Sequence, residues 1–87
     1  MFYVYILQDK FGKLYTGYTN DLRRRLQQHI KNHTKSTKNR AVKCIYYEAC
    51  IERSDALRRE HYLKTSQGKR MIQQRLKDFL YKQRNAK

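Results

Sequence analysis

The first eighteen residues carry the hydrophobic pattern of a β-hairpin. Residues 2–8 are aromatic and β-branched, which favours an extended strand. Residues 9–12 form a turn sequence in which Gly12 can adopt a positive φ. Residues 13–18 then return as a second strand. We therefore predict a hairpin that has an odd-length loop or a bulge, with Gly12 in the left-handed conformation.

The next twelve residues predict an amphipathic helix. The Thr19–Asp21 segment supplies helix-start residues, and Asn20 is the predicted N-cap. Three apolar residues recur every fourth position and form one buried stripe: Leu22, Leu26 and Ile30. Arg25 and His29 are also four residues apart and flank this stripe, so we expect both on one side of the helix.

A polar, basic segment follows from Lys31 to Lys43 and contains almost nothing to bury. We interpret it as a long loop. Its cations either grip phosphate groups or belong to a solvated connector, and the sequence leaves both possibilities open. The candidate phosphate contacts are Lys35, Lys38 and Arg40. Residues 44–51 then form a third predicted strand.

The remainder of the chain predicts two more helices, with Ser54–Asp55 capping the first, which runs from Ala56 to Lys64. Ala56, Leu57 and Leu63 define its apolar face, and Glu60 falls within that face. A buried carboxylate is costly without a partner, so we expect a metal ion or Arg25 beside it. Residues 69–82 predict a last helix. The element order is ββαβαα.

Composition narrows the class of partner. The 87 residues suffice for one domain, and 21 Lys and Arg against seven acidic residues give a net charge of +14. Such a charge binds polyanions, because each neutralised phosphate releases counterions. DNA, RNA, a ribosome or an anionic membrane surface would all satisfy it. No run of about 18 apolar residues is present, so we expect no membrane span.

The two cysteines predict a reducing compartment. Cys44 and Cys50 lie six residues apart in one predicted strand, a separation of about 20 Å that a disulfide cannot bridge. Two cysteines without further ligands also make no zinc site. We therefore expect reduced thiols and a cytoplasmic protein.

Four short segments follow one another in a recognisable order. The first two, Tyr3-Val4-Tyr5 and Tyr15-Thr16-Gly17, are similar to the two paired elements that name the GIY-YIG nuclease family. Residues 21–29 resemble the helix that carries its catalytic arginine, and residues 54–60 resemble the segment with its metal-binding glutamate. The resemblance spans residues 2 to about 66. It implies an α/β (α+β) fold, with a small three-stranded antiparallel sheet flanked by helices, in one nuclease domain over residues 1–87.

The resemblance also implies roles for individual residues. Two tyrosines, one arginine and one histidine match the catalytic positions: Tyr5, Tyr15, Arg25 and His29. Glu60 matches the single carboxylate that binds a divalent ion, Mg²⁺ or Mn²⁺, and Gly17 matches the glycine of the second motif. These groups are expected to line one pocket at the scissile phosphate.

One position departs from the family pattern. Some relatives, including the excision-repair nuclease domain, have a lysine directly after the second motif's glycine, where this chain has Tyr18. If that lysine activates a tyrosine elsewhere, His29 or Arg25 would have to replace it. We favour Tyr5 as general base or proton relay. Tyr5 and Tyr15 share a face only if the residue numbers of directly opposed residues on the two strands add up to an even number. This is the case, for example, when Tyr5 lies opposite Gly17.

The expected function is a metal-dependent endonuclease that hydrolyses phosphodiester bonds in DNA. Its substrate choice is expected to be structure-led or weakly sequence-specific, in repair or recombination. The sequence leaves the oligomeric state open, with a monomer as the default. The first alternative is a non-catalytic module that binds DNA or structured RNA on the same fold. A basic RNA- or ribosome-associated protein is a further alternative.

Overall fold

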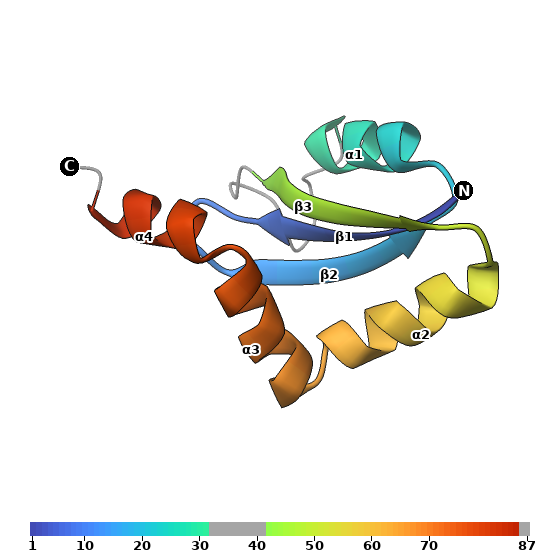
Figure 1. Cartoon of the computed structure of the whole chain (residues 1–87). Coiled ribbons are helices and arrows are strands. Elements are labelled where there is room, and N and C mark those ends of the chain that lie inside the picture. The colour runs from blue at the N-terminus through green and yellow to red at the C-terminus, as the bar shows by residue number, and fades with distance from the viewer. Residues whose placement is uncertain (32–41, 86–87) are drawn as a thin grey trace.

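The structure, a computed structural model, describes residues 1–31 and 42–85, and it contains a three-stranded sheet and four helices within them (Figure 1). The elements are β1 Phe2–Gln8, β2 Leu14–Thr19, α1 Leu22–Lys31, β3 Lys43–Cys50, α2 Arg53–Leu63, α3 Ser66–Arg75 and α4 Lys77–Asn85. All pairings are antiparallel, in the order β2-β1-β3. The predicted α+β class and its antiparallel sheet are confirmed.

The prediction of one last helix over residues 69–82 is wrong, because two helices, α3 and α4, cover this segment. Leu76 leaves the helical conformation, with φ −106° and ψ 26°, and separates α3 from α4. A straight helix would carry its second half away from the sheet. The break instead lets Gln83 of α4 exchange two amide hydrogen bonds with the buried Gln8 of β1, at 2.8 and 2.7 Å. The order is therefore ββαβααα.

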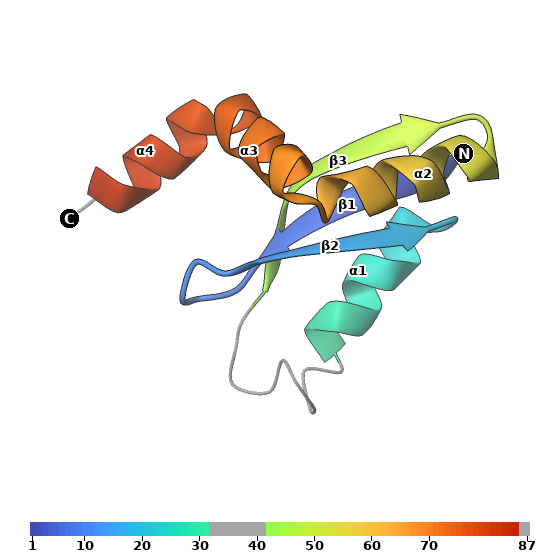
Figure 2. The same ribbon diagram turned by 90° about the horizontal axis from the view of Figure 1, so that it is seen from below.

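The two faces of the sheet carry different helices. Val4 and Ile6 of β1 point to the face covered by α2 and α3, where they form the core with three helical residues: Ala56, Leu63 and Ile72. Tyr5 and Leu7 alternate with them and point to the opposite face, where α1 lies. Figures 1 and 2 both place α1 on one side of the sheet and α2 with α3 on the other. Strand β2 is an edge strand between these two sides.

The hairpin has the predicted register. Tyr5 lies opposite Gly17, an even sum, and Gly12 has a φ of +90°. The backbone N–H of Asp9 donates to the Lys13 carbonyl at 3.0 Å, which closes a three-residue loop. The Asp9 carboxylate accepts two more backbone N–H groups of the turn. Because the loop has an odd number of residues, the odd-numbered side chains of β1 and β2 lie on the same face of the sheet.

Both predicted helix starts need correction. Helix α1 is capped by Asp21 rather than Asn20, because the Asp21 carboxylate accepts the Arg24 N–H at 3.1 Å. The Asp21 N–H in turn donates to the Thr19 hydroxyl. Helix α2 begins at Arg53, before the predicted Ser54–Asp55 cap, and Glu52 precedes it without a side-chain cap.

Helix α2 lies along the sheet with three distinct sides. Ala56 and Leu63 are buried, two turns apart, and face the core. Leu57, predicted on that face, is 36% exposed, because it lies about 100° around the helix from Ala56. On the side toward β3, Arg59 donates two hydrogen bonds of 2.9 Å to Glu48. This bidentate pair fixes the rotation of α2 about its axis.

The carboxylate of Glu48 is ionised despite its position. Burial raises the pKa of Glu48, but hydrogen bonds from Arg59 and Tyr46 outweigh burial and hold the pKa below its ordinary value of 4.5. The Arg59–Glu48 pair therefore persists at neutral pH.

Cys44 and Cys50 are both free thiols, as predicted. Within the described residues, no helix has the length and apolar character needed to span a bilayer.

Candidate active site

Tyr5, Arg25 and His29 meet above the sheet. The Tyr5 hydroxyl lies 3.3 Å from His29 Nε2, and Arg25 Nε donates to the same hydroxyl oxygen at 3.3 Å. The rings of Tyr5 and His29 pack edge to face with centroids 6.0 Å apart. Arg25 and His29 are one turn apart on α1, so the helix presents both to one phenol. The structure thus brings together three of the predicted site residues.

Gly17 makes room for this arrangement. Tyr5 lies opposite Gly17 and its ring passes over the glycine: a Cβ added to Gly17 would lie 2.4 Å from the Tyr5 hydroxyl oxygen. No side chain could share that space. The absence of a Cβ therefore lets the Tyr5 ring cross β2 toward the edge of the sheet, where α1 brings Arg25. Conformational freedom of the glycine backbone plays no part in this role.

His29 is neutral at neutral pH. Desolvation by burial, and secondly the charge of Arg25, lower the pKa of His29 from its ordinary value of 6.5. A neutral imidazole has one ring nitrogen that accepts. With the proton on Nδ1, Nε2 accepts the Tyr5 O–H while the phenol oxygen accepts from Arg25. The cluster thus forms a directed chain of donors and acceptors.

This packing predicts the effect of Gly17→Ala. The added methyl group displaces the Tyr5 ring, which is 3% exposed and has little space to move. We expect a loss of about 1–3 kcal/mol in unfolding free energy, the usual cost of overpacking. Removing His29 from its contact should also raise its pKa toward 6.5. Denaturant unfolding and NMR titration of His29 measure the two effects. A variant with wild-type stability and His29 pKa would contradict this role for Gly17.

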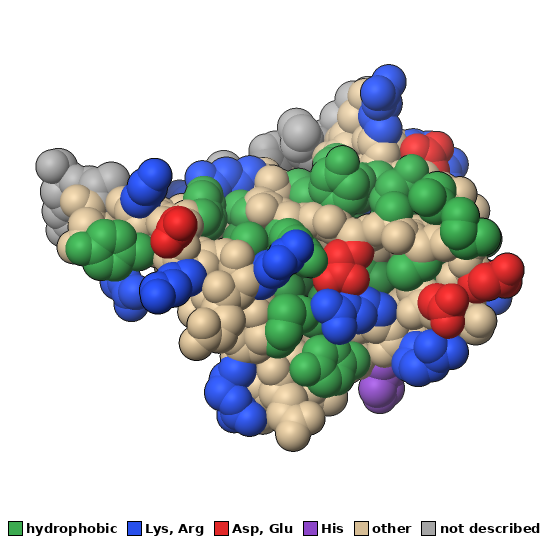
Figure 3. Space-filling model, in the orientation of Figure 1, with side chains coloured by type: hydrophobic (Ala, Val, Ile, Leu, Met, Phe, Trp, Pro, Cys, Tyr) green, Lys and Arg blue, Asp and Glu red, His purple; other side chains and the backbone are tan. Residues whose placement is uncertain are grey.

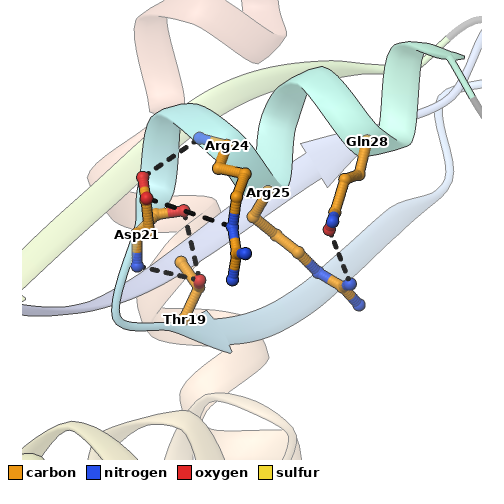
Figure 4. A network of polar contacts seen from close by, with 5 residues as sticks. All are labelled: Thr19, Asp21, Arg24, Arg25 and Gln28. Atoms are coloured by element: carbon orange, nitrogen blue, oxygen red, sulfur yellow. Dashed lines mark hydrogen bonds and ion pairs between the residues drawn. The ribbon is translucent and has the colours of Figure 1, made fainter.

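Arg25 is exposed and extends from α1 toward β2 (Figure 4). Its Nη1 donates to Gln28 Oε1 at 3.3 Å, and its Nε is held by Tyr5. Arg24 instead faces Asp21 at 4.0 Å, at the start of the helix. Of these two neighbouring arginines, only Arg25 contacts the phenol, which separates it from an ordinary solvated charge.

Tyr15 lies on the same sheet face as Tyr5, opposite Leu7 of β1. Its hydroxyl donates to Asp9 Oδ2 at 2.9 Å, and Lys13 Nζ lies 5.4 Å from its ring centroid. These contacts place the Tyr15 hydroxyl at the hairpin loop.

Glu60 lies on α2, on the other side of the sheet from α1. Its side chain is 21% exposed and pairs with Lys64 Nζ at 3.2 Å, one turn along the helix. In the structure the cation beside Glu60 is thus Lys64 rather than Arg25. The phenols and the carboxylate thus do not share one face, so a ligand that contacts both has to pass around an edge of the sheet.

The position of Arg53 shows that Glu60 is directed to the β2 edge. Arg53 and Glu60 are seven residues apart, so they lie on the same side of α2. Arg53 Nε donates to the Tyr18 hydroxyl on β2 at 3.2 Å. Arg59 lies about 100° around the helix from Glu60 and faces β3, so Glu60, on the same side as Arg53, lies toward β2.

A polar cleft of about 320 Å³ opens at the end of β2. Residues from β2, α1 and the start of α2 line it: Tyr18, Thr19, Asn20, Arg24, Arg25, Gln28 and Arg53. Sequence reasoning did not identify Arg53 or the role of Tyr18. Taking Ser54–Asp55 as a helix cap placed Arg53 outside the helix. Its seven-residue spacing from Glu60 was the signal that could have identified it.

Other predicted site residues lie outside the described part of the chain, namely Lys35, Lys38 and Arg40. Among the residues that are described, no three His, Cys, Asp or Glu side chains form a group that could hold a metal ion.

Comparison with known proteins identifies the family of the chain. Residues 1–74 match the family model described as the GIY-YIG catalytic domain. The chain is 42% identical to a UPF0213 protein of Staphylococcus saprophyticus over 72% of its own length and 79% of the relative's. UPF0213 proteins of Clostridium perfringens and Haloquadratum walsbyi are also 42% identical, over 74% and 72% of this chain and 71% and 73% of theirs. No solved structure gives a significant match. The chain therefore belongs to the GIY-YIG family of nuclease-type catalytic domains.

Proposed function

We propose that this protein is a metal-dependent endonuclease that hydrolyses phosphodiester bonds in DNA. The observation that carries the proposal is the Tyr5 hydroxyl, held between the guanidinium of Arg25 and the imidazole of His29. Phosphodiester hydrolysis needs a cation for the phosphate and an acceptor for a proton. The cluster supplies both within hydrogen-bond distance of one oxygen.

Arg25 is the proposed phosphate ligand. Its Nε and Nη1 are occupied by Tyr5 and Gln28, which orient the planar guanidinium toward the β2 edge. Guanidinium groups bind phosphate oxygens with charge-assisted hydrogen bonds and stay charged at every physiological pH. Arg25 would stabilise the additional negative charge of the phosphorane-like transition state.

Tyr5 and His29 are the proposed proton-transfer pair. A water held beside the phosphate at Arg25 would lie near the Tyr5 oxygen. Tyr5 can take its proton while passing its own proton to Nε2 of the neutral His29. Tyr15 is the second hydroxyl on this face, and its role is proposed to be secondary. Separate Tyr5→Phe and Tyr15→Phe variants distinguish the two: the larger rate loss is expected for Tyr5→Phe.

Glu60 is the proposed ligand of a divalent ion. GIY-YIG nucleases generally use divalent metal ions. A single carboxylate fits Mg²⁺ or Mn²⁺, because these ions take their remaining ligands from water and from substrate phosphates. Glu60 faces the β2 edge, and its partner Lys64 is an exposed, movable cation. When bound, such an ion supplies charge for the scissile phosphate and the leaving oxygen.

The proposed substrate is DNA with nicks, branches or single-stranded parts, in repair or recombination. The net charge of +14 supports binding to phosphates irrespective of sequence. On the face drawn in Figure 3, Lys and Arg side chains are spread over several elements rather than gathered into one reading surface. Structure-led choice of substrate is consistent with such a distribution.

The state of His29 predicts the pH dependence of cleavage. Only neutral His29 accepts the Tyr5 proton, so kcat/KM should be constant above the pKa of His29 and fall about tenfold per pH unit below it. Because the pKa is lowered, the inflection lies below 6.5. A pH–rate profile at fixed metal concentration measures it. His29→Ala should be slower and lose this inflection, and an inflection retained in that variant would assign it to another group.

The competing function is a nucleic-acid-binding module that does not cleave. Labelled branched and single-stranded DNA, incubated with Mg²⁺ or Mn²⁺ or with EDTA, separates the two. We expect products only with metal. Binding of the same oligonucleotides without products in any metal, by a protein whose fold is intact, would favour the binding module.

A further inference from the structure

The cleft at the end of β2 has the composition of an anion site. Three of its seven lining residues are arginines, and the others are a phenol, a hydroxyl and two amides. No carboxylate lines it, although Asp21 lies 4.0 Å from one of the three guanidinium groups. Three positive charges with hydrogen-bond donors around one cleft favour a phosphate group over a neutral or cationic ligand.

The three arginines come from two sides of the sheet. Arg24 and Arg25 extend from α1, as Figure 4 shows, and Arg53 approaches from the start of α2. The cleft thus bridges the two helices around the edge of β2. A nucleic-acid strand that follows this edge would pass Arg25 and then Arg53.

Tyr18 holds Arg53 in position. The Tyr18 hydroxyl accepts from Arg53 Nε at 3.2 Å, and its ring stacks on Phe2 at 6.4 Å between centroids. The two terminal nitrogens of Arg53 make no hydrogen bond with any residue between 1–31 or 42–85 in the structure. These nitrogens form the bidentate edge of a guanidinium. Tyr18 of β2, at the position that departs from the family pattern, therefore orients the guanidinium of Arg53 from α2.

We propose that Arg53, oriented by Tyr18 and assisted by Arg24, binds the non-scissile phosphate next to the one held by Arg25. The substrate class is a nucleic-acid strand with at least two consecutive phosphates. This inference rests on the proposed function only in that Arg25 takes the scissile phosphate. Arg53 is a positioning residue: it fixes the register of the strand and does not touch the reacting atoms.

The test is a binding measurement in EDTA, so that it does not depend on cleavage. The probe is a single-stranded tetranucleotide, in which each phosphate is replaced in turn by a neutral methylphosphonate. Arg53→Ala should weaken binding of the unmodified probe roughly tenfold, the worth of a charged hydrogen-bonding contact. The same variant should bind one particular methylphosphonate probe as tightly as the wild type does, because the phosphate that Arg53 contacts is then absent. Arg25→Ala should likewise bind as tightly as the wild type to the probe in which the neighbouring phosphate is neutral.

Two variants serve as controls. Arg58→Ala removes an exposed arginine of the same helix that pairs with Asp55 at 3.0 Å, and it should leave the affinity within about twofold. Tyr18→Phe removes the hydroxyl, keeps the ring and should reproduce part of the Arg53→Ala loss at the same phosphate.

The outcomes separate the two proposals. An Arg53→Ala loss that is equal for every probe would show a general charge effect and overturn the phosphate site. A loss at one phosphate from Arg53→Ala, together with no cleavage by the wild type, would support the site and reject the nuclease. Cleavage by the wild type, together with unaltered binding by Arg53→Ala, would support the nuclease and reject the phosphate site at Arg53.

Discussion

Replacement of Arg25 by alanine should reduce kcat/KM for DNA cleavage by about 10²–10³-fold, the usual effect of removing one donor to a charged transition state. Affinity for uncleaved DNA should fall far less, because many cations contribute to a field of +14. Arg25 combines contact with the Tyr5 hydroxyl and an exposed guanidinium at the β2 edge. Single-turnover cleavage and equilibrium binding on the same oligonucleotide separate the two quantities.

Arg23→Ala is the matched control for this prediction. Arg23 is another exposed arginine of α1, and it is not among the residues that line the cleft at the end of β2. We expect a rate close to that of the wild type when DNA is saturating. Equal rate losses in the two variants would mean that charge on α1, and not contact with the phenol, determines the rate.

Replacement of Glu60 should have the second large effect. Glu60→Gln keeps the size of the side chain but removes the charge that binds a divalent ion, so metal-dependent cleavage should fall at least 10²-fold at ordinary metal concentration. Higher Mn²⁺ should restore part of it, because the loss is one of metal affinity. The stability should change by less than about 1 kcal/mol, since Glu60→Gln keeps the size of this partly buried side chain and its ion-pair partner Lys64 is exposed. Cleavage as a function of Mn²⁺ concentration measures this.

Lys64→Ala is the control for Glu60. It breaks the same ion pair and leaves the carboxylate in place. If Glu60 acts by binding metal, Lys64→Ala should cleave at least as fast as the wild type, because the competing cation is gone. A loss equal to that of Glu60→Gln would instead assign the effect to the ion pair and to the position of α2.

The strands could be predicted because their signals are local. Tyr and β-branched residues alternate through residues 3–6, and Gly12 at a turn sets an odd loop, which placed Tyr5 opposite Gly17. The amphipathic stripe of α1 likewise predicted that Arg25 and His29 lie together. Each of these inferences depends on neighbours a few residues apart.

The errors have a common physical origin in tertiary contacts. The break at Leu76 depends on where Gln83 meets Gln8, which are 75 residues apart. The exposure of Leu57 depends on the rotation of α2, which Arg59 fixes by binding Glu48. Helical spacing gives the angles between side chains but not which angle faces the core.

The same limitation applies to the site. The order of elements in the sequence does not tell which face of the sheet a helix covers. We therefore expected one pocket, whereas α1 and α2 lie on opposite faces of the sheet. In the proposed mechanism the substrate strand lies at the edge of β2, where it can contact groups from both faces. The hydrogen bond between Arg53 and Tyr18 supports this proposal, because it joins α2 to β2 at that edge.

The proposed mechanism requires that one phosphodiester at the β2 edge contact the guanidinium of Arg25 on one side and a metal ion at Glu60 on the other. The most direct measurement is a crystal structure with Mn²⁺ and a short phosphorothioate oligonucleotide, in which anomalous scattering locates the metal. We predict Mn²⁺ bound to the Glu60 carboxylate, and one phosphate that touches both this ion and the guanidinium of Arg25. A phosphate at Arg25 with the metal separated from it by the sheet, or bound away from Glu60, would contradict the account.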